Sequence, residues 1–331
     1  MTDRRGFGIL IGVLAAIVLC SMAVSLVIGP ATIPAGAGLT ALFVDDGAVS
    51  LVMREIRLPR TLLAAMIGAT LGITGAALQG FLRNPLADAG VLGIGSSAAL
   101  GAVIAIYSGL SAAFPLALPF CALAGAIVAV LLVLTLGGQA STTTLILAGI
   151  AVSSLAAALT SLALNLSSSP FAALEIVFWL LGSLNDRSML HVELAAPFMI
   201  AGWILIASLS RPLDALTLGN DAAASLGFRL SQVRLLLVIG TAASVGAATA
   251  VSGSIGFVGL VAPHLLRPFV GGMAGRLLLA SWLGGAALLL VADIAARVIS
   301  PDRDLKLGVV TALVGAPFFL VLVLRSRSGQ L

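Results

Sequence analysis

The sequence predicts an all-α polytopic membrane protein with about ten transmembrane helices. Of its 331 residues, 60% are hydrophobic and only 9% are charged, whereas soluble domains carry about 25% charged residues. A bilayer core of about 30 Å is crossed by roughly 20 apolar residues in a helix. The apolar runs are long and continuous, whereas a membrane β-barrel would alternate polar and apolar residues in segments of about ten. Helices are therefore predicted.

The first predicted span covers residues 7–29. This apolar run is longer than the core of a secretory signal peptide, which has about 7–15 residues. Leu19 before Cys20 is also too large a residue for a lipoprotein cleavage site. We expect the segment to remain in the membrane with Arg4 and Arg5 on the cytoplasmic side, because basic residues concentrate there.

Nine further spans are predicted from the apolar runs. They are 58–80, 90–108, 114–136, 142–165, 191–209, 231–251, 255–270, 277–297 and 306–324. A short amphipathic segment at 171–184 is expected to lie at the membrane interface or to re-enter the membrane. Ten crossings place the N- and C-termini on the same side, the cytoplasm, and residues 1–331 form a single transmembrane domain.

The basic residues show only a weak positive-inside bias under this topology. Ten lie inside and seven outside. The outer set is Arg54, Arg57, Arg60, Arg187, Arg297, Arg303 and Lys306. The positive-inside rule disfavours basic residues on the outer side, so the outer arginines are expected to have a role that keeps them there.

The sequence excludes several kinds of chemistry. A phosphate-binding loop needs Gly-Lys-Ser/Thr, and the only lysine is Lys306 within DLKLG, so ATP hydrolysis is not expected of this chain. Two histidines and two distant cysteines predict no metal site, and no cofactor or nucleic acid is expected to bind. Ser254 and His264 could form the Ser/His pair of an intramembrane protease, but no recognised motif places a base beside Ser254. An enzyme therefore ranks a distant third among the possible functions.

An ion-coupled secondary transporter built on an inverted repeat is the alternative to be weighed. Such carriers usually need a carboxylate within the membrane. The span interiors hold mainly Thr, Ser and Gly, and the best candidate, Asp293, lies near the outer end of its span. A structural role at the helix end is favoured for Asp293.

Three stretches together resemble one known family. They read RLPRTLLAAMIGATLGITGAALQGFLRNPLADAGVLGIGSSAALGA at 57–102, RPLDALTLGNDAAASLGFRLSQVR at 211–234, and GSIGFVGLVAPHLLRPFVGG followed by ADIAARV and LGVVTALVGAPFFLVLVLR within 253–325. The chain resembles the FecCD-type permeases, the membrane subunits of ABC importers for iron-siderophores, haem and cobalamin. Two loops depart from the family pattern: DLKLG at 304–308 and GMAGR at 272–276.

The resemblance implies the organisation of a larger assembly in the bacterial cytoplasmic (inner) membrane. Two permease subunits, expected to be identical copies, enclose a central path. Two cytoplasmic ATPase subunits hold the ATP and Mg, and one extracytoplasmic solute-binding protein delivers the cargo. The family's inverted pseudo-repeat would relate spans 2–5 to spans 7–10. Among the possible cargoes, a siderophore is the first expectation, on the breadth of the family alone.

The segment 211–229 is predicted to couple the permease to the ATPase. In the family this loop forms two short cytoplasmic helices that fit a groove on the ATPase. Pro212 is expected to stop span 6, the glycines to allow turns, Asn220 or Asp221 to cap the second helix, and the leucines to supply apolar contact surface. The predicted coupling residues are Arg211, Pro212, Leu213, Leu216, Leu218, Gly219, Asn220, Leu226 and Gly227.

The resemblance also implies a cytoplasmic gate and a docking site for the binding protein. The gate would comprise Asn84 and Leu86 from FLRNPLADAG, with Thr142 and Thr143 from STTTLILAG; in a capped loop, Ser141 or Thr142 would instead serve as the N-cap of the span, and the two roles are compatible. Docking is assigned to three outer arginines, which would meet acidic residues on the two lobes of the binding protein. They are Arg57, Arg60 and Arg297. Snorkelling at the interface remains the interpretation for Arg54, Arg187 and Arg303.

Overall fold

The computed structural model describes residues 4–45, 47–114, 116–137, 142–167, 169–300 and 304–327, and the regular structure within these ranges is entirely helical. The long helices are α1 (Arg4–Val27), α4 (Leu58–Leu82), α5 (Ile94–Tyr107), α7 (Ala117–Gly137), α8 (Thr142–Asn165), α9 (Pro170–Leu180), α10 (Met189–Ala207), α13 (Leu230–Ser252), α15 (Ala274–Ile299) and α16 (Leu307–Arg327). The short helices are α2 (Ala35–Ala41), α3 (Ala48–Leu51), the π-helical turn η1 (Val52–Arg57), η2 (Ala89–Leu92), α6 (Leu110–Ala113), α11 (Ser210–Leu216), α12 (Asn220–Ser225), α14 (Val258–Leu266) and η3 (Arg267–Phe269).

Seven helical segments of the described chain are long and apolar enough to cross a membrane: α1, the continuous helix Ala48–Leu82, α7, α8, α10, α13 and α15. The other three predicted spans contain the short helices α5 and α14, and α16, which has 21 residues but whose apolar part is the shorter segment Leu307–Val321. At about 1.5 Å per residue, the 14 residues of α5 and the 9 of α14 do not cross a core of about 30 Å by themselves. The protein is an all-helical polytopic membrane protein, and the count of ten crossings stays a prediction.

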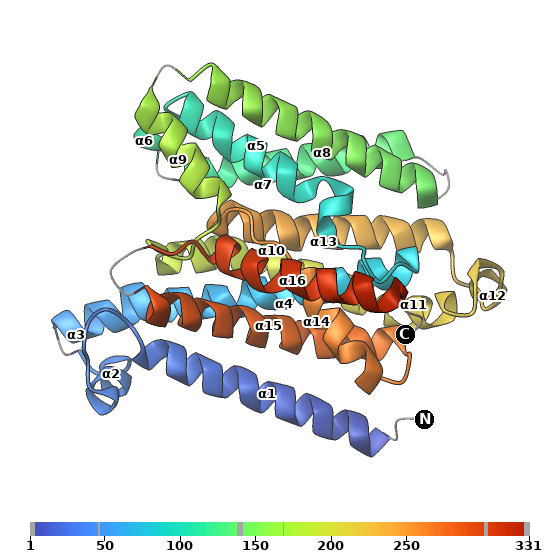
Figure 1. Ribbon diagram of the computed structural model, residues 1–331, viewed down its shortest axis with the longest axis horizontal. Coiled ribbons are helices and arrows are strands. Elements are labelled where there is room, and N and C mark those ends of the chain that lie inside the picture. The colour runs from blue at the N-terminus through green and yellow to red at the C-terminus, as the bar shows by residue number, and fades with distance from the viewer. Residues whose placement is uncertain are drawn as a thin grey trace.

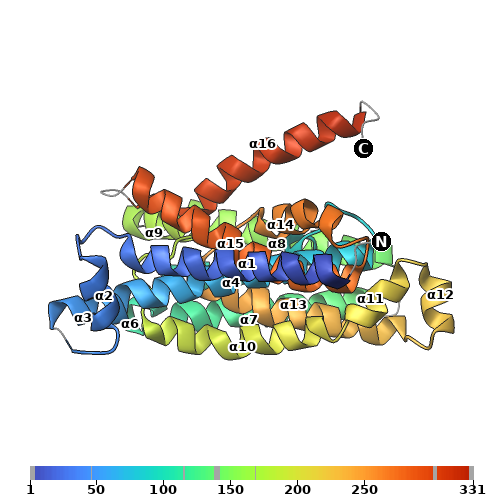
Figure 2. The ribbon, with the colours of Figure 1, turned by 90° about the horizontal axis from the view of Figure 1, so that it is seen from below.

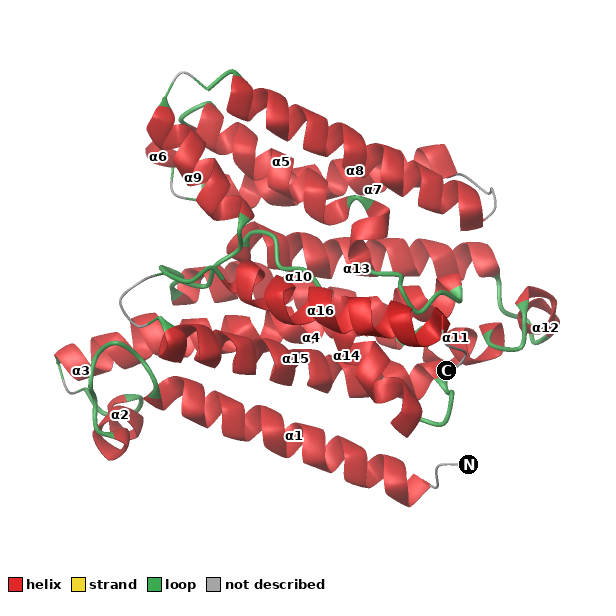
Figure 3. Cartoon of the chain, viewed as in Figure 1, coloured by secondary structure: helices red, strands yellow, loops and turns green. Residues whose placement is uncertain are grey.

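The helices form two groups (Figure 1). One contains α5, α7 and α8, and the other contains α1, α4, α10, α14 and α15, while α13 packs against both. Helix α16 crosses in front of the second group and runs outward from the bundle toward its C-terminal end (Figure 2). The connecting loops gather mainly at the two ends of the bundle (Figure 3).

Helix α4 forms the centre of the second group because glycines let its backbone approach α15. A Cβ on Gly68 would lie 2.3 Å from the carbonyl oxygen of Gly285, and one on Gly72 would lie 1.9 Å from that of Ser281. Small residues allow such close packing in lipid, where no hydrophobic force drives helices together. The interpretation of the glycine repeat at 68–72 as a packing motif is confirmed.

The first described helix begins and the last described helix ends at the same end of the bundle. Helix α1 begins and α16 ends where α11 and α12 project (Figures 1 and 2). This arrangement fits the prediction that the two termini share a side of the membrane. Which side they occupy stays a prediction.

The helix lengths follow a similar order in the two halves of the chain. Helices α4, α5, α7 and α8 contain 25, 14, 21 and 24 residues, and α13, α14, α15 and α16 contain 23, 9, 26 and 21. In each half the second helix is the shortest of the four. This order fits the predicted inverted repeat, which stays a prediction.

Candidate functional site

A cavity of about 480 Å³ lies between the two helix groups. It is bounded by α4, η2, α5, the second half of α8, the end of α9, α13, the loop 253–257 and the start of α14. The residues that line it are Leu71, Thr74, Asp88, Ala89, Gly90, Gly95, Ser96, Ala99, Ala157, Thr160, Ser161, Leu164, Leu180, Val245, Thr249, Ser254, Ile255, Gly256, Phe257 and Gly259. Such a volume is within the usual range for a small-molecule site, about 300–1,000 Å³.

The lining of the cavity is weakly polar and carries little charge. Six hydroxyl side chains stand among small and apolar residues, and Asp88 is the one ionisable residue among the described lining residues. Its Oδ1 accepts a hydrogen bond from the Gly90 amide at 2.9 Å, so Asp88 caps η2. Burial raises the pKa of Asp88, while backbone hydrogen bonds from Gly90 and Val91 act in the opposite direction.

The sequence alone did not single out Asp88. It lies in the segment FLRNPLADAG, from which only Asn84 and Leu86 were chosen. The local pattern gave no signal, because the segment also contains Arg83, Asn84 and Pro85 and lies between two predicted spans, where an acidic residue is ordinary.

Helix α16 packs against Phe257, which precedes α14 and lines the cavity. This residue has a φ of 68°, in the left-handed region that a bulky side chain seldom adopts. Its ring packs on α16 so closely that a Cβ on Gly315 would lie 2.4 Å from the Phe257 Cβ. The ring centroids of Phe257 and Phe319 are 6.3 Å apart. The position of α16 is therefore linked directly to the cavity wall.

The predicted gate residues lie at element ends rather than in the cavity lining. The Asn84 side chain accepts a hydrogen bond from the Leu86 amide at 3.0 Å, which forms a local turn, and both residues are exposed. Thr143 is exposed at the start of α8, and the Thr142 side chain lies outside the described part of the structure. Helix α4 ends and α8 begins at the end of the bundle that carries α12 (Figure 1). The gate role stays a prediction.

The predicted coupling segment does form two short helices, α11 and α12, but its leucines divide into two kinds. Leu213 and Leu216 are 0% and 2% exposed, because α11 packs on α4 and α15. Leu218 and Leu226 are 73% and 61% exposed. The expectation that all four supply external contact surface is therefore wrong for Leu213 and Leu216, which hold α11 to the bundle.

The local details of this segment also differ from the expectation. Helix α10 ends at Ala207, and Pro212 lies within the first turn of α11, so it does not stop the span. Helix α12 has Gly219 as its N-cap, without a side-chain cap, and the Asn220 side chain instead accepts a hydrogen bond from Arg83 at 3.2 Å. The predicted turns are confirmed, since Gly219 and Gly227 have φ values of 109° and 88°. Arg211 is exposed.

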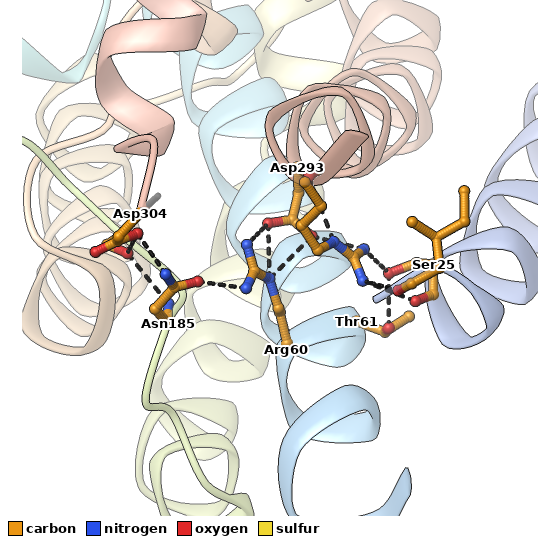
Figure 4. Close-up of polar contacts among 9 residues, drawn as sticks. Ser25, Arg60, Thr61, Asn185, Asp293 and Asp304 are labelled. Atoms are coloured by element: carbon orange, nitrogen blue, oxygen red, sulfur yellow. Dashed lines mark hydrogen bonds and ion pairs between the residues drawn. The ribbon is translucent and has the colours of Figure 1, made fainter. Parts of the chain in front are cut away.

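A buried charge cluster lies at the opposite end of the bundle (Figure 4). Arg60 and Arg297 each place a guanidinium nitrogen 2.8 Å from a carboxylate oxygen of Asp293. The Asp293 side chain is 1% exposed. Arg60 also donates to Asn185, and Asn185 donates to Asp304, so the cluster reaches the loop before α16. The predicted structural role of Asp293 agrees with these contacts.

Arg57 and Arg297 are engaged at the end of α1. Arg57 donates from Nη1 to the carbonyls of Leu26 and Val27 at 2.9 and 2.7 Å. Arg297 donates from Nη1 to the carbonyl of Ile28 at 2.6 Å and from Nη2 to the Ser25 hydroxyl at 2.6 Å. The last carbonyls of a helix lack partners within the helix, and these two side chains supply them.

These contacts change the interpretation of the outer arginines. The guanidinium groups of Arg57 and Arg297 are directed into the chain, and only Arg60 keeps an appreciably exposed side chain, at 18%. Binding-protein docking stays a prediction for all three, and for Arg57 and Arg297 it requires these contacts to break. Arg54 likewise donates to the carbonyls of Ala41 and Leu42 at the end of α2, whereas Arg303 lies outside the described residues.

Residues 16–325 match the model of the FecCD transport family. The chain belongs to the FecCD transport family. It is 40% identical over 293 residues to the ABC transporter permease protein YvrB of Bacillus subtilis, across 86% of this chain and 82% of YvrB. It is 39% identical over 277 residues to the Fe(3+) dicitrate transport system permease FecD of Escherichia coli, across 83% and 86% of the two chains. The cobalamin import permease BtuC of Halobacterium salinarum is 39% identical over 279 residues, across 83% and 74%.

A solved structure described as an inward-facing ABC transporter of the metal-chelate type has the same fold. The TM-score is 0.85 at 33% identity, and the match covers 96% of this chain and 99% of that one. As a FecCD-family chain, the protein is an ABC transporter permease, a multi-pass membrane subunit that is not itself catalytic.

Proposed function

We propose that this chain is the permease of a bacterial ABC importer in the cytoplasmic membrane and that it forms the path for an intact iron chelate or cobalamin. The cavity between the helix groups carries the proposal. Its lining offers hydroxyls, small residues and one carboxylate, and no cluster of three or more metal-ligating side chains occurs among the described residues. Such a wall suits a chelate that passes whole, without exchange of metal ligands. Relatives named for Fe(3+) citrate and cobalamin support this class of cargo.

A second permease subunit completes the path in this proposal. Helix α16 extends from the bundle and exposes a set of apolar side chains. These are Leu313, Val314, Leu320, Val321 and Leu324. We propose an identical copy as the partner on the α8 and α16 side, where it would close the cavity.

Two cytoplasmic ATPase subunits drive the transport cycle, and they hold the ATP and Mg. The exposed Leu218 and Leu226 flank α12, which projects from the end of the bundle. Because α11 is packed into the bundle through Leu213 and Leu216, a displacement of α12 would move α4 and α15. An extracytoplasmic solute-binding protein would deliver the cargo at the opposite end.

An ion-coupled secondary transporter would need a carboxylate that is free to bind the ion, and Asp293 was the best candidate for it. The carboxylate of Asp293 is paired with two arginines and buried at the end of the bundle. It is therefore occupied structurally rather than available to an ion.

Co-purification tests the proposed assembly. The tagged chain is solubilised gently from its native membrane, and its partners are identified by mass spectrometry for the wild type, the double variant Leu218→Asp/Leu226→Asp, and the control Ser225→Asp. The control adds one of these negative charges at a polar, exposed position of α12. We expect an ATPase with the wild type and the control and its loss from the double variant. A folded wild-type protein that transports on a proton gradient alone and brings no ATPase would contradict the proposal.

A further inference from the structure

We propose that an anionic phospholipid binds in a groove between α4, α10 and α15, with an acyl chain in the groove and its headgroup at Arg211. The groove has a volume of about 440 Å³. Its walls include Ile73 of α4, Trp203 and Ile204 of α10, and Trp282 of α15. This site belongs to the membrane-facing surface of the protein and is separate from the cavity between the helix groups.

The walls of the groove suit a hydrocarbon chain. The rings of Trp203 and Trp282 pack edge to face with their centroids 5.4 Å apart, and the Trp203 indole donates its N–H to the Thr70 hydroxyl at 2.9 Å, within the bundle. Two of the lining side chains, Ile204 and Leu279, are 64% and 44% exposed. The groove is therefore apolar and opens to the outside of the bundle.

The groove lies within one leaflet of the bilayer. The three helices that form it are all long and apolar enough to cross a membrane. Along α15 the groove runs from Gly275 to Trp282, which is about 10 Å at 1.5 Å per residue and less than half of a bilayer core of about 30 Å. Helix α10 lies on the side of the bundle opposite α16 (Figure 2). Because the second permease copy is assigned to the side of α16, we assign the groove to a lipid.

The end of the groove at α11 carries a net positive charge. Ser210 and Gly275 line this end, and they are followed in the chain by Arg211, which is exposed, and by Arg276, whose guanidinium lies over an aromatic ring of α1. The acid here, Asp214, accepts a hydrogen bond from the Gly275 amide at 2.8 Å and so joins α11 to α15. Basic pockets between transmembrane helices on the cytoplasmic side bind anionic lipid headgroups. Arg211 is the cation that we assign to the headgroup.

Photo-crosslinking with two lipid probes tests the inference. The full-length protein, purified with the subunits that accompany it, is placed in phosphatidylcholine vesicles that contain either phosphatidylglycerol or phosphatidylcholine with a diazirine on an acyl chain. Mass spectrometry locates the labelled residues. We expect the phosphatidylglycerol probe to label residues 203–210 and 275–282 about fivefold more than the phosphatidylcholine probe, the effect of one arginine near a headgroup. The exposed apolar side chains of α7 should show no such preference.

Two variants separate the acyl chain from the headgroup. Ala207→Phe fills the groove from an exposed position in its lining and should remove the labelling by both probes. Ala201→Phe, at an exposed position of α10 outside the lining, is its control and should label like the wild type. Arg211→Gln should abolish the fivefold preference and leave the labelling by phosphatidylcholine unchanged. Arg4→Gln removes an exposed charge at the same end of the bundle, on α1, and should keep the preference.

Several results would overturn the inference. Equal labelling of the wild-type groove by the two probes, or a preference that persists in Arg211→Gln, would show ordinary bilayer lipid without recognition of the headgroup. Unchanged labelling in a folded Ala207→Phe would place the acyl chain elsewhere, and if that variant does not fold, Arg211→Gln decides alone. Crosslinks from the groove to a second copy of the chain would assign the groove to the dimer. The experiment measures lipid contact rather than uptake, so its failure leaves the proposed function intact.

Discussion

Arg60 of α4 and Asp293 of α15 form a buried ion pair, with Nη2 2.8 Å from Oδ1. Arg297 approaches the other carboxylate oxygen of Asp293 at the same distance. One acid therefore compensates two guanidinium groups at the end of the bundle opposite α12, where α1, α4 and α15 meet. These two arginines were predicted to meet the acids of another protein, but one acid of this chain already pairs with both.

Removal of this acid should destabilise the protein strongly. Asp293→Ala leaves two largely buried guanidinium groups without a carboxylate, and breaking a buried pair by removing one partner typically costs about 3–5 kcal/mol. Thermal unfolding in detergent measures the change. Asp221→Ala is the control, because this carboxylate is exposed on α12 at the opposite end of the bundle, and an exposed charge should contribute about 0–1 kcal/mol. Equal midpoints for the two variants would contradict the role of Asp293.

Arg57→Met should loosen the outer end of α1. The change removes the donors to the carbonyls of Leu26, Val27 and Ala31, and a buried acceptor left without a partner costs about 1–3 kcal/mol. Hydrogen–deuterium exchange over residues 25–31 should become faster. Arg211→Met, at the opposite end of the bundle, should leave this segment unchanged. Weaker binding-protein docking with unaltered exchange would favour the docking role instead.

The leucines of the coupling segment should separate into structural and contact residues. Leu213→Asp places a charge in a fully buried site, so we expect misfolding and a loss of protein from the membrane. Leu218→Asp changes a side chain that is 73% exposed and should leave a folded permease that recruits less ATPase. Size-exclusion profiles and ATPase recovery measure the two effects. Similar folding defects in both variants would show that Leu218 is also packed.

A methyl group at Gly72 should disturb the contact between α4 and α15. It would lie 1.9 Å from the Ser281 carbonyl oxygen, so the helices must separate, at a cost of about 1–3 kcal/mol. The matched control is Gly12→Ala on α1, where no atom lies within 4 Å of the added group. That change should be neutral or slightly stabilising, because alanine favours helix more than glycine does. A common unfolding midpoint for both variants would argue against close packing at Gly72.

By itself, the sequence determined the features that depend on composition and local backbone. The apolar runs specified membrane helices, because the bilayer thickness sets their length. The glycine spacing at 68–72 indicated a tight helix contact, and Gly219 and Gly227 marked turns that need a positive φ. The family motifs, spread over nearly the whole chain, identified an ABC permease before any contact was known.

The tertiary structure alone decided which way the polar and apolar side chains of the loops and helix ends point. Leu213 and Leu218 are alike in sequence, but α15 covers only the first. In the sequence, Arg57 and Arg297 look like typical surface residues. In the structure they donate hydrogen bonds to carbonyls at the end of α1 that have no partner within the helix. Asp88 becomes part of a cavity only when α4, α8 and α13 converge, since burial and charge environment depend on contacts between residues that are distant in the chain.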